Sequence, residues 1–380
     1  PQIAADFCFD WLLGCPRHPR WGQGVQEMTL APTKDWRADM IYTQKTTASL
    51  ASRIDEATRE AQAQIDSGLI QGVVFALGDA GPVTAVGWQR VKPEKRPMTP
   101  ASRFDMASAG KTFTASCCAI LASQGRLDPD APLTRYLPEH ALGPSCAITV
   151  RDLATHASGF DNSKPYNSAD ADVFLRELMH KLPVRSRQEA FEYACSNFIL
   201  LGLIVERISG QGLEEFAAQQ LWSPLGMTNT QWTAPGDGPD EVEHWHPNRT
   251  PGLHNDDVCF NCPFPIGSGS CFSTVPDMLK FLQDILARKQ FAQSYYDLIG
   301  GCGFAKNGAR RSFGWDMSAA HRPRHCSDNA IYHSGFTGQS ICVDPDTGFA
   351  AAVLTSRMGD WEQAYQGRVR IMEKLAGFIG

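Results

Sequence analysis

A serine and a lysine three residues apart are the pair in this sequence with the clearest capacity for chemistry. Ser108 and Lys111 lie within Phe104–Phe113 and open a stretch that predicts an apolar helix. On a helix, residues i and i+3 share one face, so the hydroxyl and the amine can meet. A serine nucleophile needs such a neighbour because a free hydroxyl is inert at neutral pH. The helix start stabilises developing negative charge and disfavours an ammonium, which predicts a neutral Lys111 that acts as a base.

Alone, the Ser-x-x-Lys pattern is a weak signal. A chain of 380 residues contains about one such match by chance, and the same residues describe a capped helix with an exposed lysine. However, the chain from about Leu50 to its C-terminus resembles the serine β-lactamase and penicillin-binding-protein-like superfamily. The resemblance is to the class C β-lactamase branch, and within it to the family VIII carboxylesterases. Besides Ser-x-x-Lys it rests on segments that follow the family's order, namely Leu127–Pro138, Ile148–Gly159, Pro224–Met227, Gly269–Thr274 and Phe313–Trp315.

The resemblance places the family's second element, Tyr-x-Asn, just before a Leu-Leu-Gly helix. Counting back from Gly202 assigns the tyrosine to Tyr193, and the asparagine position then holds Cys195. In the family this asparagine contacts the substrate amide, so Cys195 implies a change in substrate binding. A second register would use Asn197, with Cys195 at the tyrosine position, but it removes the phenol from the site. The resemblance implies that Tyr193 shuttles protons beside Lys111.

The third element lies near the end of the chain. Class C enzymes carry Lys-Thr-Gly on an edge strand, and their esterase-like relatives often carry His-x-Gly. Here His333, Ser334 and Gly335 fill the three positions and are expected to bind substrate. A glycine lets the strand approach the substrate closely. The resemblance further implies that the backbone N–H groups of Ser108 and Phe336 form an oxyanion hole.

Other polar clusters are weaker candidates for chemistry. Metal ligands could be read in His244, His246, His254, Asp256 and Asp257, or in the Cys259-x-x-Cys262 pair. Neither group completes a recognisable metal signature. The stretch Gly252–Asp257 instead resembles a segment at the active-site rim of the family. We therefore predict no metal and no cofactor.

The elements that position these residues follow from periodicity and turn signals. An amphipathic helix is predicted from Ser49 to about Ser67, because apolar residues recur there at helical spacing. Two short strands follow at 72–78 and 83–88, joined by a Gly- and Pro-containing turn. Further helices are expected at 108–123, 149–155, 196–208, 277–286 and 361–378, and further strands at 331–334, 339–343 and 349–354.

Strands at both ends with helices between them predict an α+β fold. The resemblance implies the β-lactamase/transpeptidase-like version, an antiparallel sheet flanked by helices with a mainly helical inserted subdomain. The sheet part is expected at about 47–106 and 300–380, and the helical part at about 107–299. Residues 1–46 lie outside the resemblance and predict an N-terminal extension of unknown role.

Composition excludes several classes of protein. Lys and Arg number 35 against 41 Asp and Glu, a net charge of −6, whereas a general nucleic-acid binder would be basic. No run of 18 apolar residues exists, so we predict no membrane span. The twelve cysteines predict mostly free thiols in a reducing compartment, which favours a cytoplasmic location. Export stays open, because any signal peptide would lie upstream of Pro1. The oligomeric state is not indicated.

These observations predict a serine hydrolase that cleaves an ester or amide bond in a small-molecule or peptide substrate. Ser108 would form the acyl-enzyme, with Lys111 and Tyr193 as the general base. Cys195 and His333 both depart from the lactamase pattern and favour an esterase or amidase over a β-lactamase. The alternatives are a D-amino-acid peptidase (DD-carboxypeptidase) or β-lactamase, an acyltransferase, and a non-catalytic scaffold that has kept the fold.

Overall fold

A computed structural model describes residues 49–78, 81–244, 246 and 248–377. The predicted N-terminal extension, residues 1–46, lies outside the described residues. The ten described cysteines are free thiols. No helix in the described part of the chain is both long and apolar enough to cross a membrane.

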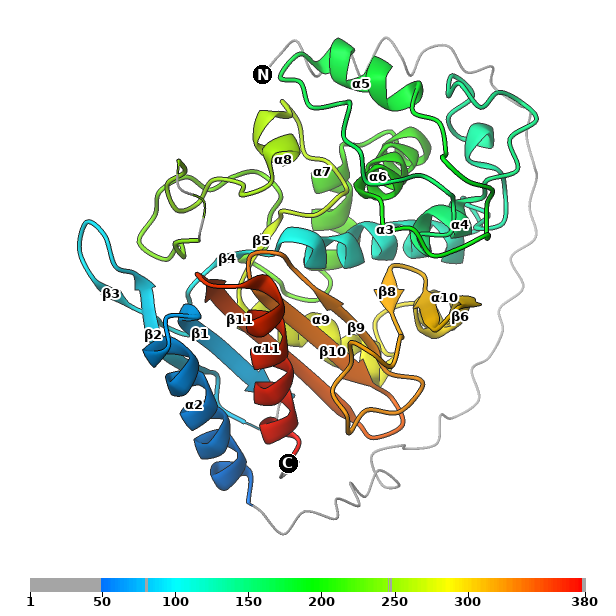
Figure 1. Cartoon of the computed structure of the whole chain (residues 1–380). Coiled ribbons are helices and arrows are strands. Elements are labelled where there is room, and N and C mark those ends of the chain that lie inside the picture. Colours follow the sequence, from blue (N-terminus) through cyan, green and yellow to red (C-terminus); the bar gives the residue numbers. More distant parts are fainter. Residues whose placement is uncertain (1–48, 79–80, 245, 247, 378–380) are drawn as a thin grey trace. The chain divides into compact units, whose positions relative to one another are not determined.

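A nine-stranded sheet forms the centre of the fold, with the strand order β3-β2-β1-β11-β10-β9-β8-β7-β6. Every neighbouring pair is antiparallel. The strands are β1 Ile70–Leu77, β2 Thr84–Arg90, β3 Arg96–Pro97, β6 Cys302–Lys306, β7 Ala309–Ser312, β8 Trp315–Asp316, β9 Ile331–Ser334, β10 Gln339–Asp344 and β11 Phe349–Arg357. Strands from both ends of the chain therefore share one sheet, as the sequence predicted (Figure 1).

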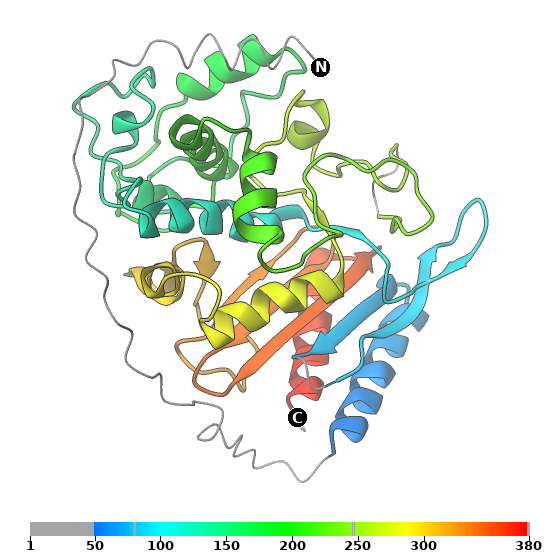
Figure 2. The ribbon, with the colours of Figure 1, turned by 180° about the vertical axis from the view of Figure 1, so that it is seen from behind.

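Helices cover both faces of this sheet. Helices α2 (Leu50–Asp66) and α11 (Trp361–Leu375) lie side by side on one face (Figure 1), and α9 (Val275–Ala287) crosses the other (Figure 2). Strand β1 shows why the sheet needs two cores, because all eight of its residues are buried. Its side chains alternate in direction, so Val74 belongs to the core on the α9 side and Phe75 to the core under α2 and α11.

The remaining helices gather beyond the edge of the sheet, around α3 (Lys111–Ser123) (Figure 1). Helix α3 is buried from Lys111 to Leu121 and packs against α6 and α10. The other helices are α4 Val150–Ala154, α5 Ala171–Met179, α6 Cys195–Ser209, α7 Leu213–Ala217, α8 Asp257–Asn261 and α10 Gln293–Gly300. Two short strands, β4 (Phe104–Asp105) and β5 (Phe272–Ser273), pair just before α3.

The predicted helices and strands agree best with the observed ones where the sequence has a long periodic pattern. The helix predicted at 49–67 is α2, and the strands predicted at 331–334, 339–343 and 349–354 are β9, β10 and β11. Strands β6, β7 and β8 were not predicted, because they are short and alternate only weakly between buried and exposed residues. The helix predicted at 108–123 begins instead as a 3-10 turn, Ala107–Gly110. The predicted division into a sheet part and a helical part stays a prediction.

Phe113 of α3 offers a test of how tightly the helical part packs. Its fully buried ring contacts Trp222, Trp232 and Phe281, with ring centroids 5.7, 6.5 and 5.1 Å away. We expect Phe113→Ala to lower the free energy of unfolding by about 3–5 kcal/mol, because it leaves a cavity among large rings. Leu182→Ala is the control, since Leu182 is 56% exposed, and it should change the free energy by less than about 0.5 kcal/mol. Urea unfolding measures both, and equal effects would contradict this packing.

Candidate active site

The turn that carries Ser108 is held in a strained conformation. Ala107 has a φ of +43°, in the left-handed region that residues other than glycine rarely adopt. Its N–H donates to Asp105 Oδ1 at 2.8 Å, and its carbonyl accepts from the N–H of Ser270 at 2.8 Å. These bonds, with the β4–β5 pair beside them, hold Ala107 in place. Ser108 is thereby presented at the wall of two cavities.

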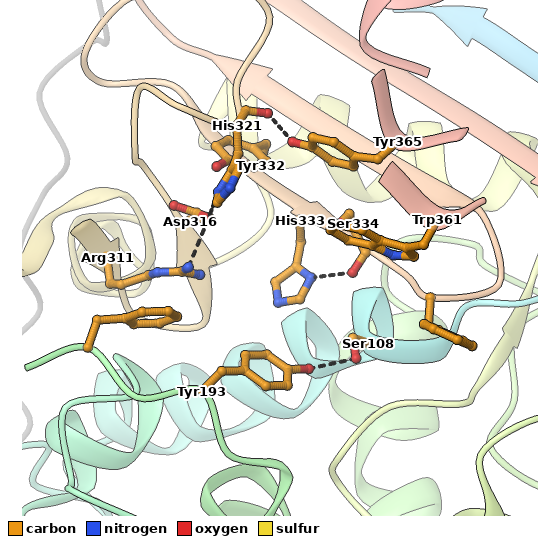
Figure 3. Close-up of a pocket in the computed structure, with 12 residues that line it drawn as sticks. Ser108, Tyr193, Arg311, Asp316, His321, Tyr332, His333, Ser334, Trp361 and Tyr365 are labelled. Atoms are coloured by element: carbon orange, nitrogen blue, oxygen red, sulfur yellow. Dashed lines mark hydrogen bonds and ion pairs between the residues drawn. The ribbon is translucent and has the colours of Figure 1, made fainter. Parts of the chain in front are cut away.

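Three of the predicted site residues meet at the Ser108 hydroxyl. The Oγ lies 2.7 Å from the Tyr193 hydroxyl (Figure 3). It also accepts a hydrogen bond from Lys111 Nζ at 3.2 Å. Tyr193 comes just before α6, whereas Lys111 is the first residue of α3. The packing of α3 against α6 therefore brings together groups that are 82 residues or more apart in the sequence. This is the geometry expected of a nucleophile with its base within hydrogen-bond reach.

The surroundings of Lys111 identify its charge state. Its fully buried amine donates to Ser108 Oγ, to Cys195 Sγ at 3.6 Å and to the carbonyl of Ser268. An ammonium has three N–H donors, which matches three acceptors, whereas a neutral amine has two. Burial acts to lower the pKa of Lys111, but electrostatic interactions with Cys195 and Tyr193 raise the pKa above its ordinary range. The prediction of a neutral Lys111 is therefore wrong, because the three acceptors and the interactions with Cys195 and Tyr193 outweigh the effects of burial and the helix start.

The surroundings of Tyr193 determine whether its phenol is protonated. Burial raises the pKa of its phenol, and the ammonium of Lys111 opposes this rise. In the resting site the phenol thus holds its proton. Lys111 lies 5.1 Å from the centre of the Tyr193 ring, where it stabilises any negative charge that forms on the phenol oxygen.

The positions of Cys195 and Asn197 distinguish the two registers weighed from the sequence. Cys195 begins α6, contacts Lys111 and lines one of the two cavities. The fully buried Asn197 instead accepts from Ser158 Oγ at 2.7 Å and contacts His156 Nδ1 at 3.1 Å. Asn197 lines neither cavity that contains Ser108. The geometry therefore fits the register that uses Tyr193 and Cys195.

Strand β9 delivers the third predicted element to the same place. His333 lies above the Ser108–Tyr193 pair (Figure 3), and its Nδ1 contacts the carbonyl of Ser334 at 3.0 Å. Because a carbonyl only accepts, Nδ1 carries the proton and Nε2 keeps a lone pair. Burial and the charge of Lys111 lower the pKa of His333 to about 3, so the ring is neutral. His333 can accept a hydrogen bond here but supplies no positive charge, unlike the lysine of Lys-Thr-Gly.

Gly335 lets the end of β9 approach the nucleophile turn. A Cβ at this position would lie 2.5 Å from the carbonyl oxygen of Met106, closer than real side chains come to the backbone. Gly335 also donates its N–H to the carbonyl of Gln339 at 2.8 Å, which closes the turn into β10. Ser334 and Phe336, on either side of Gly335, both line the cavity that also contains Ser108 and Tyr193. The predicted His333–Phe336 element thus lies against the nucleophile turn.

Two cavities meet at Ser108 and differ in character. The larger, about 390 Å³, has mainly aromatic walls, whereas the smaller, about 300 Å³, is lined mainly by polar residues. Besides Tyr193 and the His333–Phe336 element, residues lining the larger cavity are Phe191, Arg311, Asp316, His321, Tyr332, Trp361 and Tyr365 (Figure 3). The smaller cavity includes Lys164, Cys195, Asn255, Asp256 and Asp257 among its lining residues. The Gly252–Asp257 stretch, which resembles a rim segment, therefore does reach the site.

The charged wall of the larger cavity was missed by sequence reasoning. Arg311 pairs with Asp316 at 2.9 Å, and His321 lies 3.5 Å from the same carboxylate. Burial opposes ionisation of Asp316, but His321 and Arg311 lower its pKa to about 2. Asp316 in turn raises the pKa of His321. The one available signal was the family-like segment Phe313–Trp315, which lies between Arg311 and Asp316 in the chain.

The residues weighed as metal ligands have other partners. His244 accepts the N–H of Asp105 through Nε2 at 3.2 Å, and burial lowers the pKa of His244 to about 4. The carboxylate of Asp256 pairs with Lys164 at 2.6 Å. Among residues 49–78, 81–244, 246 and 248–377, no group of three or more His, Cys, Asp or Glu side chains is placed to hold a metal ion.

Comparison with known proteins identifies the family. The family model described as Beta-lactamase matches residues 54–374. The chain belongs to the Beta-lactamase family. This confirms the predicted membership of the serine β-lactamase and penicillin-binding-protein-like superfamily, whose members are serine hydrolases.

Individual relatives are distant. The N-acetylmuramyl-L-alanine amidase of Bacillus subtilis (strain 168) is 26% identical over 68% of this chain and 69% of its own. The D-alanyl-D-alanine-carboxypeptidase/endopeptidase AmpH of Escherichia coli (strain K12) is 29% identical, over half of each chain. Among solved structures, a class C beta lactamase has a TM-score of 0.74 at 18% identity, covering 88% of this chain and 99% of its own. The structure of EstCE1, a hydrolase with promiscuous acyltransferase activity, has a TM-score of 0.71 at 19% identity. That match covers 87% of this chain and 99% of the EstCE1 chain. These structures establish the fold alone.

The raised pKa of Tyr193 predicts an alkaline pH dependence for acylation of Ser108. The phenolate is the form that accepts a proton, and a raised pKa populates it only as the pH approaches or exceeds roughly 10, the ordinary value for tyrosine. We expect kcat/KM for a neutral ester to rise about tenfold per pH unit between about pH 6 and about pH 9. Stopped-flow measurement of acylation checks this. A flat profile over the range would contradict Tyr193 as the titrating base.

Proposed function

We propose that this protein is a serine hydrolase that cleaves an ester or amide bond through an acyl-enzyme on Ser108. The observation that carries the proposal is the Ser108 hydroxyl, which lies within hydrogen-bond distance of both Tyr193 and Lys111. As Oγ attacks the carbonyl carbon, its proton passes to the phenolate oxygen of Tyr193. The ammonium of Lys111 stabilises negative charge on both oxygens.

The tetrahedral intermediate needs donors for its oxyanion. We assign this role to the backbone N–H groups of Ser108 and Phe336, which belong to the nucleophile turn and the turn after β9. When the intermediate collapses, the bond to the leaving oxygen or nitrogen breaks, and Tyr193 returns its proton to that atom. Water then attacks the acyl-enzyme by the same steps, which frees Ser108.

The substrate we favour is an ester or amide with an apolar, ring-sized group on one side of the scissile bond. Support comes from the aromatic wall of the larger cavity, which includes Trp361 stacked on Tyr365 with ring centroids 5.6 Å apart. Two features favour ester or amide hydrolysis over β-lactam hydrolysis. Cys195 stands where the family has an asparagine that contacts the substrate amide, and His333 is neutral where class C enzymes have a lysine.

A peptidase acting on D-amino-acid peptides is the second candidate. The names of two relatives, an N-acetylmuramyl-L-alanine amidase and a D-alanyl-D-alanine-carboxypeptidase/endopeptidase, favour it. Acyl transfer to an alcohol instead of water is consistent with the same acyl-enzyme. The complete set of Ser108, Lys111 and Tyr193 argues against a non-catalytic scaffold.

The nucleophile is tested by covalent labelling. A fluorophosphonate probe should label the native protein at Ser108, because an activated serine displaces its fluoride and becomes phosphonylated. Ser108→Ala should abolish labelling, and Tyr193→Phe should slow it by roughly 100-fold or more, since a general base contributes about that much. Ser334→Ala, at the same cavity but outside the proton path, should still be labelled. Undiminished labelling of Ser108→Ala would refute the assignment.

The substrate class is tested with a panel of nitrophenyl esters, a chromogenic cephalosporin and a D-Ala-D-Ala peptide. We expect the esters to be turned over fastest, because their ring matches the aromatic cavity. Cys195→Asn should raise cephalosporin turnover relative to ester turnover, as it restores an amide that can contact the substrate. Rapid peptide turnover with negligible ester turnover would instead establish the peptidase.

A further inference from the structure

The segment Thr155–Gly159, which ends the family-like stretch Ile148–Gly159, is not explained by the proposed reaction. Within it, His156 is buried and lines neither cavity that contains Ser108. It has a φ of +55°, in the left-handed region. Among residues other than glycine, histidine is one of the few enriched there, yet the conformation still costs free energy. Such strain at a buried histidine calls for a compensating set of contacts.

These contacts converge on Tyr193 from three directions. The carbonyl of His156 accepts the N–H of Glu192 at 2.9 Å, and its ring Nδ1 accepts the N–H of Ala194 at 3.2 Å. The residues immediately before and after Tyr193 are therefore both bound to one histidine. The imidazole also lies against the Tyr193 ring, with centroids 4.5 Å apart and planes inclined by 33°.

The protonation state of His156 follows from the same hydrogen bonds. Because Nδ1 accepts the Ala194 N–H, the proton of a neutral imidazole must be on Nε2. Asn197 reinforces this state, since its Nδ2 lies 3.1 Å from the same Nδ1 while its Oδ1 accepts from Ser158. Burial, with the charges of Arg311 and Lys111, lowers the pKa of His156, so the ring stays neutral. The buried Nε2 has no partner among the described residues.

Filling the space beside Tyr193 does not by itself require a histidine with these hydrogen bonds. A phenylalanine would supply the same ring without leaving a buried N–H unsatisfied, which costs about 1–3 kcal/mol. What phenylalanine lacks is the acceptor for the Ala194 N–H. His156 therefore lowers the stability of the fold through its unsatisfied Nε2–H. In return, its Nδ1 holds the backbone next to Tyr193 while its ring supports the Tyr193 ring.

We propose that His156 is the positioning residue for Tyr193, holding the phenol oxygen at the Ser108 hydroxyl through backbone clamps on both sides and ring contact. The inference rests on the proposed function, in which Tyr193 accepts the Ser108 proton. Proton transfer depends steeply on the separation of the two oxygens, which is 2.7 Å here. A displacement of about 1 Å can cost on the order of 100-fold in rate.

The test compares His156 with a matched buried histidine. His140 is also buried, also accepts a backbone N–H through Nδ1 (from Leu142, at 3.3 Å), and also has a buried Nε2 without a described partner. It lines neither cavity that contains Ser108. His156→Phe and His140→Phe each keep a ring and each remove one acceptor. Asparagine tolerates positive φ, so His156→Asn serves where His156→Phe does not fold.

We expect His156→Phe or His156→Asn to lower kcat for a nitrophenyl ester by roughly 10- to 100-fold, with KM changed by less than about threefold. His140→Phe should lower the melting temperature but change kcat by less than about twofold. The double variant His156→Phe/Tyr193→Phe should be no slower than Tyr193→Phe alone, because a positioning residue acts only through the group it positions.

Each opposite result overturns the role of His156. Retained kcat in the His156 variants, while Tyr193→Phe is inactive, would refute positioning but leave the proposed function intact. Positioning would also be refuted if the double variant lost kcat by the product of the two single losses. An equal loss of kcat in His140→Phe would refute it too. Full activity of Tyr193→Phe would refute the proposed base, and with it the role of His156.

Discussion

The buried ammonium of Lys111 is the constraint around which the site is arranged. An unpaired charge in this fully buried position would cost several kcal/mol, so acceptors must surround it. They come from three separate parts of the chain, at Ser108, Cys195 and Ser268. The interactions that make the charge tolerable therefore also fix the nucleophile and the start of α6. Disturbing any one of the three elements would leave the ammonium short of an acceptor.

The same charge sets the ionisation of its neighbours. It opposes the burial-driven rise in the pKa of Tyr193, and together with burial it keeps His333 neutral. Arg311, which lines the larger cavity, is instead paired with Asp316. Lys111 thus supplies the positive charge next to the nucleophile. A carbonyl that develops negative charge at Ser108 would lie close to the ammonium of Lys111.

Cys195 lines the smaller cavity at a position where the family has an asparagine. An asparagine side chain offers both a strong donor and a strong acceptor, whereas a thiol is weak in both roles. Its sulfur contacts Lys111 at 3.6 Å, so the thiol retains a part in satisfying the buried ammonium even where it cannot bind an amide. Cys195 therefore keeps the contact with the Lys111 ammonium but loses the strong hydrogen bonds that an asparagine could make to a substrate amide. This loss is why we favour an ester over a lactam.

The sequence by itself determined the family and the mixed fold with strands from both chain ends. It also predicted three elements at Ser108, Tyr193 and His333, which the structure places around one cavity. These features depend on local periodicity and on short motifs in a fixed order, which a linear chain displays directly. The charge of Lys111 could not be predicted, because it depends on Cys195 and Tyr193 approaching through the packing of α3 on α6. The short strands β6, β7 and β8 and the Arg311–Asp316 wall were missed for a related reason. Their pairing depends on the edge of a sheet assembled from distant segments. Only the tertiary structure decided which charges face each other, because electrostatic and stacking energies depend on distances that sequence separation does not set.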